Sequence, residues 1–188
     1  MARPLSDEKR SALMSAGTRV IATQGLAAQT AAIAREAGVA SGSLFTYFET
    51  KKVLFNELYL VLKAEMASAA LKSLPRNASI RKQLFSVWSN WMHWAITDPD
   101  KRRALAQLSV SEEITPETRA ASRKHTAGIA ELLEQCRAAG PMREASMGFL
   151  VSVMNSLAET TMDFMLQDPR NAEKHSQLGF EALWRILK

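Results

Sequence analysis

The sequence predicts an all-α protein, and three observations support this. Six prolines separate stretches in which apolar residues recur at helical spacing; they stand at positions 4, 75, 99, 116, 141 and 169. Runs of alternating β-branched residues and Asn-Gly or Asp-Gly hairpin turns are absent. The 188 residues are 47% hydrophobic, which is enough for a buried core. We expect about nine helices, in an N-terminal domain of residues 1–50 and a C-terminal domain of residues 51–188.

The first helix is expected from Ser6 to Gln24. Ser6 is a favourable N-cap, because its hydroxyl can accept a bond from a free backbone N–H group. Asp7 and Glu8 stand in the positive first turn, and Gly25 suits the left-handed turn that ends many helices.

Two short helices follow, separated by a glycine. One is expected from about Thr30 to Ala37, with Thr30 as its cap, and the other from Ser41 to Phe48. Gly38 stands where the chain must turn with a positive φ angle. A helix, a glycine turn and a second helix within about 20 residues are typical of a helix-turn-helix.

The remaining helices form a C-terminal bundle. A long helix at 51–73 connects it to the first domain, and further helices are expected at about 78–97, 100–111, 116–139, 143–167 and 170–187. Residues 145–166 are apolar nearly all round the helix, so this helix must be buried on more than one side. The last helix has a second apolar face. We therefore expect an isologous homodimer, formed through the last two helices as a four-helix bundle.

Charge and composition exclude several classes of protein. The net charge is +5, and residues 1–52 hold seven basic and four acidic residues, 7 − 4 = +3 of that total. A nucleic-acid surface is therefore expected at the N-terminus.

No apolar run reaches 18 residues and no signal peptide is evident, so we expect a cytoplasmic protein that does not enter a membrane.

Metal, cofactor and catalytic sites are not expected. One cysteine, Cys136, and three scattered histidines give no spacing suited to a metal, a disulfide or a nucleophile with its base. Cys136 stands beside leucines on an amphipathic helix. It is therefore interpreted as a packed residue, with a redox sensor as the less favoured alternative.

The third helix has the side chains that a DNA-reading helix needs. Small residues at its start (Ser41, Gly42, Ser43) allow a close approach to base edges. Phosphate contacts need hydroxyl or amino groups, and these are available from Thr30, Thr46, Tyr47 and Lys51. The alternative is that these polar residues form an ordinary solvated face.

Residues 30–51 closely resemble the DNA-binding signature of the tetracycline-repressor (TetR) family. The run begins Thr-Ala-Ala-Ile-Ala, continues through Ala-Gly-Val and Ser-Gly-Ser-Leu-Phe, and ends with Phe48 and Lys51. The resemblance implies a dimer whose third helix reads the major groove and whose C-terminal body binds an inducer. By position, it makes Thr30, Tyr47 and Lys51 phosphate contacts, and it makes Ser41, Gly42, Ser43, Phe45 and Thr46 the groove-facing set. Phe45 departs from the family, which often has tyrosine there, so a hydroxyl contact is lost.

Two stretches of the body, residues 107–112 (Gln-Leu-Ser-Val-Ser-Glu) and 157–164 (Leu-Ala-Glu-Thr-Thr-Met-Asp-Phe), resemble regulators of multidrug efflux within the same family. That likeness implies a pocket for aromatic or cationic organic compounds. Trp88 and Trp91 lie on one helical face, and aromatic faces attract cations. The expected ligand-binding residues are Tyr59, Met66, Trp88, Trp91, Thr160, Asp163 and Phe164. The alternative is that these side chains only pack the core.

The sequence thus favours a TetR-type repressor that is released from a near-palindromic operator by a small organic ligand. The target would be a gene of multidrug efflux or detoxification. One alternative is a DNA-binding dimer without an inducer. An enzyme that uses the aromatic pocket is less favoured, because a nucleophile with its base and a glycine-rich phosphate loop are both missing.

Overall fold

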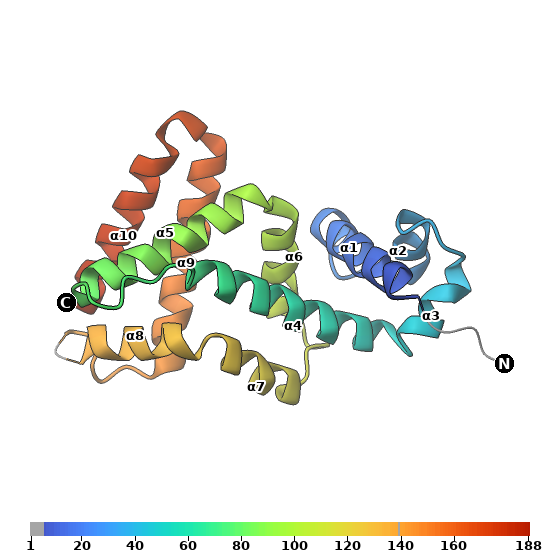
Figure 1. Cartoon of the computed structure of the whole chain (residues 1–188), viewed down its shortest axis with the longest axis horizontal. Helices are drawn as coiled ribbons and strands as arrows, with labels where there is room; N and C mark the ends of the chain where they lie inside the picture. The colour runs from blue at the N-terminus through green and yellow to red at the C-terminus, as the bar shows by residue number, and fades with distance from the viewer. Residues whose placement is uncertain (1–5, 139) are drawn as a thin grey trace. The chain divides into compact units, whose positions relative to one another are not determined.

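A computed structural model describes residues 6–138 and 140–188, and within these ranges the chain is helical and contains no strand (Figure 1). The predicted all-α class is confirmed. The elements are α1 (Asp7–Gln24), α2 (Thr30–Glu36), the 3₁₀ turn η1 (Ser41–Ser43), α3 (Leu44–Tyr47), α4 (Lys51–Ala70), α5 (Ile80–Thr97), α6 (Pro99–Ser109), α7 (Pro116–His125), α8 (Ala127–Arg137), α9 (Met147–Gln167), the 3₁₀ turn η2 (Pro169–Asn171) and α10 (Ala172–Leu187).

The chain divides into two compact units. The first, here the head unit, comprises residues up to Ala64 together with Asp98–Lys124. The second, here the body unit, comprises Glu65–Thr97 and the residues from His125 onward. Compactness thus places α6 and α7 with the N-terminal helices. The functional boundary at residue 50 that the sequence suggests remains a prediction.

The head unit is built around α1, which packs against α2 and α6. Ser6 caps α1 by accepting a hydrogen bond from the Lys9 backbone N–H, and Gly25 ends the helix with a φ angle of 75°. Both features match the sequence expectation. The core of the unit is fully buried and apolar, and it includes Leu13, Ile21, Ile33, Leu44, Phe48, Leu54 and Leu58.

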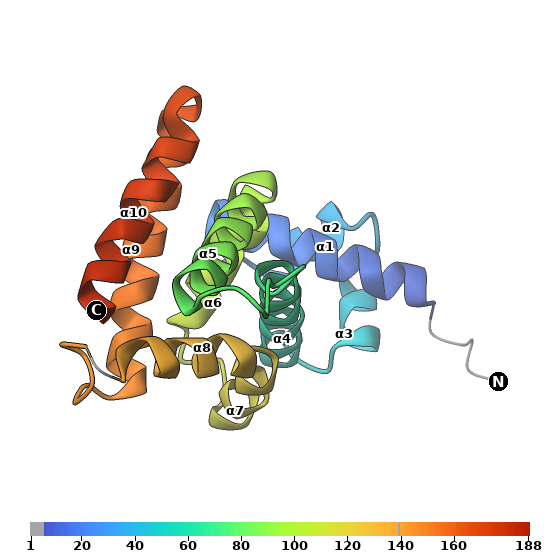
Figure 2. The same cartoon turned by 60° about the vertical axis from the view of Figure 1, so that its left-hand side comes forward.

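The body unit is built around α5, which contacts α8, α9 and α10. Figure 2 shows α9 and α10 lying side by side, in agreement with their extensive mutual contacts. α9 begins at Met147, after Ser146, whose hydroxyl accepts a bond from the Phe149 backbone N–H. The buried residues of the unit include Leu84, Trp88, Leu133, Leu150, Met162, Phe180 and Leu183.

The structure has ten α-helices in its described residues where the sequence predicts about nine. The difference arises at Thr126, where a single helix over 116–139 is expected and two are found. The backbone of Thr126 leaves the helical region (φ −97°, ψ 6°). Its carbonyl accepts bonds from the amides of Ile129 and Ala130, so a new helix starts there. The break coincides with the boundary between the units, which allows α7 and α8 to pack in different cores.

Candidate nucleic-acid interface and candidate ligand-binding residues

The turn between α2 and η1 depends on Gly38. Its φ angle is +69°, a left-handed conformation that costs other residues free energy. The Gly38 amide donates to the carbonyl of Arg35, and the Val39 amide donates to that of Ala34 (3.1 and 3.0 Å). These bonds close α2 and redirect the chain toward the next helix. The sequence prediction of a glycine turn is confirmed.

The predicted groove-facing residues lie on the surface of the head unit. Ser41, Gly42, Phe45 and Thr46 are exposed, and Ser43 is half-buried. The Phe45 ring is 52% exposed, which is unusual for so large an apolar side chain. A Cβ atom added at Gly42 would meet no neighbour within 4 Å. The segment therefore presents small side chains and one protruding ring to solvent.

The same short segment anchors itself from its other face. Leu44 and Phe48 are fully buried. Because they are four residues apart on a helical turn, Phe45 and Thr46 between them must point outward. The guanidinium of Arg10 lies 5.1 Å from the centroid of the Phe48 ring and also pairs with Glu57 of α4. The contacts of Phe48 and Arg10 thus fix the segment that carries Phe45 and Thr46 against α1 and α4.

Two predicted phosphate contacts already have partners within the head unit. The Lys51 ammonium donates to the backbone carbonyl of Leu26 (2.7 Å) and lies 5.1 Å from the Phe55 ring centroid. The Tyr47 hydroxyl accepts a long bond (3.4 Å) from the backbone N–H of Ser6. Thr30 is the first residue of α2 rather than its cap, which is Gln29. An ammonium has three donors, so the bond to Leu26 orients Lys51 and leaves two.

Sequence reasoning missed two further cations of the head unit. Arg19 is neutralised by Glu36 (2.8 Å). In contrast, Lys9 and Arg35 are exposed and form no ion pair with any residue in the described part of the chain. The positive charge counted in residues 1–52 was the available signal, but the count does not separate paired from unpaired cations.

Trp88, a predicted ligand-binding residue, is a packed residue of the body unit. Its side chain is 2% exposed, and its indole N–H donates to the Ser176 carbonyl (2.9 Å). A Cβ atom added at Gly179 would lie 3.0 Å from the indole, which shows how closely α10 approaches it. Trp91 is half-buried and meets Trp88 edge to face, with 6.3 Å between ring centroids.

The other predicted ligand-binding residues are divided among several environments. Thr160, Asp163 and Phe164 are exposed on α9, and the Phe164 ring lies 5.7 Å from the His175 ring of α10. Met66 is buried in the body unit, and Tyr59 is buried in the head unit. The structure therefore brings Trp88 and Trp91 together but leaves the three α9 residues facing solvent. Their role in ligand binding stays a prediction.

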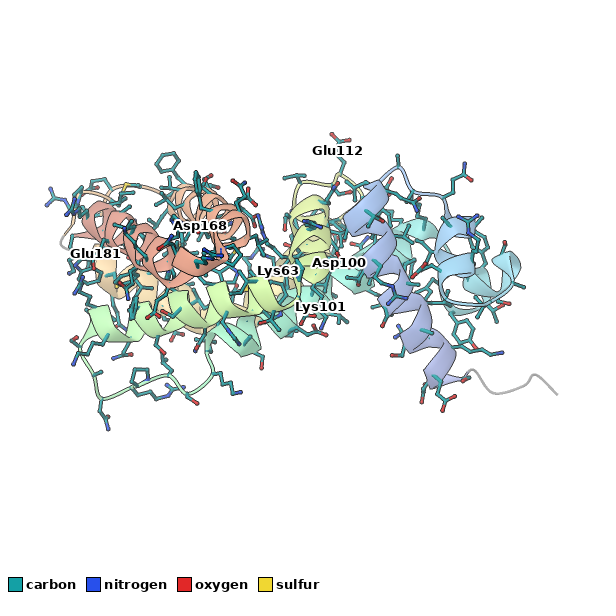
Figure 3. The ribbon with its side chains drawn as sticks, turned by 90° about the horizontal axis from the view of Figure 1, so that it is seen from above. Lys63, Asp100, Lys101, Glu112, Asp168 and Glu181 are labelled. Atoms are coloured by element: carbon teal, nitrogen blue, oxygen red, sulfur yellow. The ribbon has the colours of Figure 1, made fainter. Side chains whose placement is uncertain are left out.

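Tyr59 is flanked by two cations of the head unit. The Lys63 ammonium and the Arg119 guanidinium lie 5.7 and 6.0 Å from its ring centroid. Burial, and secondly the charge of Arg119, lower the pKa of Lys63 below its ordinary value. Arg119 also donates to the carbonyls of Ser109 and Ser111, which fixes the loop between α6 and α7. Figure 3 labels Lys63 on α4.

α9 and α10 leave apolar side chains uncovered. Phe149 and Phe164 of α9 are 57% and 52% exposed, and Leu178 of α10 is 58% exposed. On α9 the exposed or half-buried residues Phe149, Val153, Leu157 and Phe164 follow helical spacing, so they form one stripe. The opposite side of the helix, with Leu150, Met154, Ala158, Met162 and Met165, is buried.

The remaining sequence expectations concern Cys136, metal binding and membrane spanning. Cys136 is fully buried in α8, and burial raises the pKa of its thiol, which suits the packed residue that the sequence favours. No group of histidine, cysteine and carboxylate residues suited to a metal occurs in the described ranges 6–138 and 140–188. No helix in these ranges is both long and apolar enough to cross a membrane.

Comparison with known proteins finds similar sequences and structures among transcription regulators. Residues 13–58 match the family model of bacterial regulatory proteins of the tetR family. A tetR family transcription regulator from Shewanella sp. PV-4 is 26% identical, with a TM-score of 0.82 over 94% of this chain and 96% of that chain. A TetR family transcription regulator from Marinobacter aquaeolei VT8 is 23% identical, with a TM-score of 0.83 over 96% of each chain. The transcriptional regulator FadR from Bacillus subtilis, solved in complex with stearoyl-CoA, is 16% identical, with a TM-score of 0.69 over 95% of this chain and all of that chain.

Proposed function

We propose that this chain, which has the TetR-family regulator fold with an N-terminal helix-turn-helix, is a dimeric transcriptional repressor. It binds a near-palindromic operator and is released by a small organic ligand. The observation that carries the proposal is the exposed, small-residue face of η1 and α3 within the segment that matches the tetR family. Members of that family are transcription regulators rather than enzymes, so the regulator is preferred to the enzyme alternative.

The proposed DNA contacts fall into two groups. Ser41, Gly42, Ser43, Phe45 and Thr46 face the major groove. The small size of Ser41, Gly42 and Ser43 lets the backbone approach the bases. Thr30, Tyr47 and Lys51 contact phosphates, and the exposed cations Lys9 and Arg35 add to the attraction. The groove-facing set holds no charged side chain, so the shape of the DNA contributes to sequence preference.

The proposed dimer uses α9 and α10. Supporting it is the exposed apolar stripe on α9, the helix on which α10 packs, since large exposed apolar patches mark interaction surfaces. A two-fold axis through a four-helix bundle of these helices would present two heads. Their recognition helices should then dock about 34–36 Å apart, one turn of DNA.

The proposed ligand response acts through the loop between α6 and α7, which belongs to the head unit. Asn56 of α4 donates to the Glu113 carbonyl and accepts from the Thr115 amide, so α4 is tied to the loop between α6 and α7. α6 in turn packs on α1. A ligand that shifts this loop would displace α1 and α4 together, and typical coupling free energies are about 1–3 kcal/mol.

The ligand class and the target gene extend the proposal further. The tryptophans of α5 and the likeness to the Ram repressor of multidrug efflux support an aromatic or cationic organic ligand and an efflux or detoxification gene. One observation favours the alternative, a dimer without an inducer: Trp88 is buried and hydrogen-bonded, as a plain core residue would be. Trp91→Ala separates the two, because this half-buried side chain of α5 lies outside the apolar stripe of α9: loss of the ligand response with operator binding unchanged would support the inducer.

Selection of bound sequences from random duplex DNA tests the proposed function. The protein should enrich a two-fold symmetric site whose half-sites are centred about one helical turn, or a small multiple of it, apart. A Thr46→Ala variant should enrich an altered site. Failure to enrich any sequence over the input pool would refute sequence-specific DNA binding.

A further inference from the structure

A groove lined by residues of the body unit has no role in the proposed function. It has a volume of about 450 Å³ and lies between the start of α5 and α10. Volumes of about 300–1,000 Å³ are usual for small-molecule sites. Figure 3 labels Glu181 on α10, one of the lining residues.

The groove joins an apolar floor to cationic walls. Phe85 of α5 is 37% exposed and Leu178 of α10 is 58% exposed, so both present apolar surface to it. The Phe85 and Phe180 rings meet edge to face, with 4.9 Å between centroids. Arg81, Lys82 and Lys174 supply the positive charge.

One carboxylate lines the groove, and it is already neutralised. Glu181 pairs with Arg81, whose guanidinium also lies 5.8 Å from the Phe180 ring centroid. Lys82 of α5 and Lys174 of α10 form no ion pair with any residue within 6–138 or 140–188. Two positive charges therefore face the groove without compensation.

The neighbouring part of the chain adds to the positive electrostatic potential at the groove. Residues 66–97 contain four basic side chains and no aspartate or glutamate. The N-terminus of the 18-residue helix α5 also lies at the groove, and its macrodipole adds a partial positive charge.

We propose that this groove binds an amphipathic organic anion of small-molecule size. The apolar part of the ligand lies on Phe85 and Leu178, and its carboxylate, sulfate or phosphate group is held by Lys82 and Lys174. A second copy of the chain is a poorer occupant, because a two-fold contact here would oppose the uncompensated lysines of both copies.

Isothermal titration of the full-length protein with decyl sulfate and with decyltrimethylammonium tests the proposal. The two probes share an apolar chain and differ in the sign of the charge, and both are used below their micelle concentrations. Decyl sulfate should bind saturably, at one molecule per protomer in the groove. Each of the reversals Lys82→Glu and Lys174→Glu should weaken this binding about tenfold.

The matched control is Lys72→Glu, which reverses an exposed lysine of the same acid-free segment outside the groove lining. Its affinity for decyl sulfate should equal that of the unchanged protein. The proposal is overturned if decyl sulfate shows no saturable binding, if the double reversal binds it equally well, or if decyltrimethylammonium binds as tightly. A changed dimer dissociation constant in the reversal variants would instead assign the groove to a second copy.

Discussion

Replacing Gly179 by alanine tests the packing of α10 on α9 and α5. The added Cβ atom would lie 2.3 Å from the Thr161 hydroxyl oxygen, 3.0 Å from the Thr161 methyl carbon and 3.0 Å from the Trp88 indole. Thr161 cannot turn away freely, because its hydroxyl donates to the Leu157 carbonyl (2.7 Å). The indole of Trp88 is likewise held by its bond to Ser176.

The expected change in the free energy of unfolding is the sum of two opposing contributions. Overpacking of a well-packed core typically costs about 1–3 kcal/mol. Replacing glycine by alanine inside a helix stabilises it by about 1 kcal/mol. The free energy of unfolding of the Gly179→Ala variant should therefore fall by up to about 2 kcal/mol. In a Thr161→Ala background most of the clash is absent, so the same change should be neutral or stabilising.

A double-mutant cycle measured by urea unfolding at one fixed protomer concentration reads this coupling directly. The interaction free energy between the two sites should be about 1–3 kcal/mol. Gly128→Ala is the control, since its Cβ would lie at an ordinary 3.5 Å from Leu71. A coupling under about 0.5 kcal/mol, or a stabilising Gly179→Ala, would refute the described packing.

Three further predictions concern single side chains. Because burial lowers the pKa of Lys63, the folded state disfavours its charge, so Lys63→Met should raise the unfolding midpoint at pH 7. That gain should shrink as the pH rises through the lowered pKa toward 10.5, and a gain that is constant with pH would contradict it. Cys136 should react with a thiol reagent only at the rate of unfolding, whereas fast labelling of the native protein would favour the redox sensor. Trp88→Phe should lower the free energy of unfolding, measured in urea, by about 1–3 kcal/mol, because the Ser176 carbonyl loses its donor. An unchanged midpoint would show that the bond contributes nothing.

Much of the fold could be predicted from local signals. Ser6, Gly25 and Gly38 set helix ends and a turn through their own backbone chemistry, and the structure agrees with all three. The break at Thr126 could not be found, because no proline or glycine occupies it. It follows from the packing of α7 and α8 in different units. The segment 41–48 is likewise a 3₁₀ turn followed by a short α-helix rather than one helix.

The part of the candidate site that lies within one short segment could be predicted from the sequence. Leu44 and Phe48 point inward and Phe45 outward because helical spacing requires it. Tertiary partners were not predictable. The bond from Lys51 to the Leu26 carbonyl joins residues 25 apart, and the bond from Trp88 to Ser176 joins residues 88 apart. An apolar pattern also could not tell which side of α9 faces its own unit, so the exposure of Phe164 emerges only from the structure.

In the proposed function, the head binds DNA through phosphate contacts that are separate from its base-reading face. Fluorescence anisotropy over a series of salt concentrations tests it, with the selected duplex and a scrambled one. Lys51→Gln should weaken binding to both duplexes and lower the slope of log affinity against log salt by about 1 for each lysine lost, or about 2 for a dimer. Ser43→Ala should keep the slope and change the ratio between the duplexes, and Lys72→Gln should change neither. An unchanged slope in folded Lys51→Gln protein, with equal losses of preference in both head variants, would contradict the account.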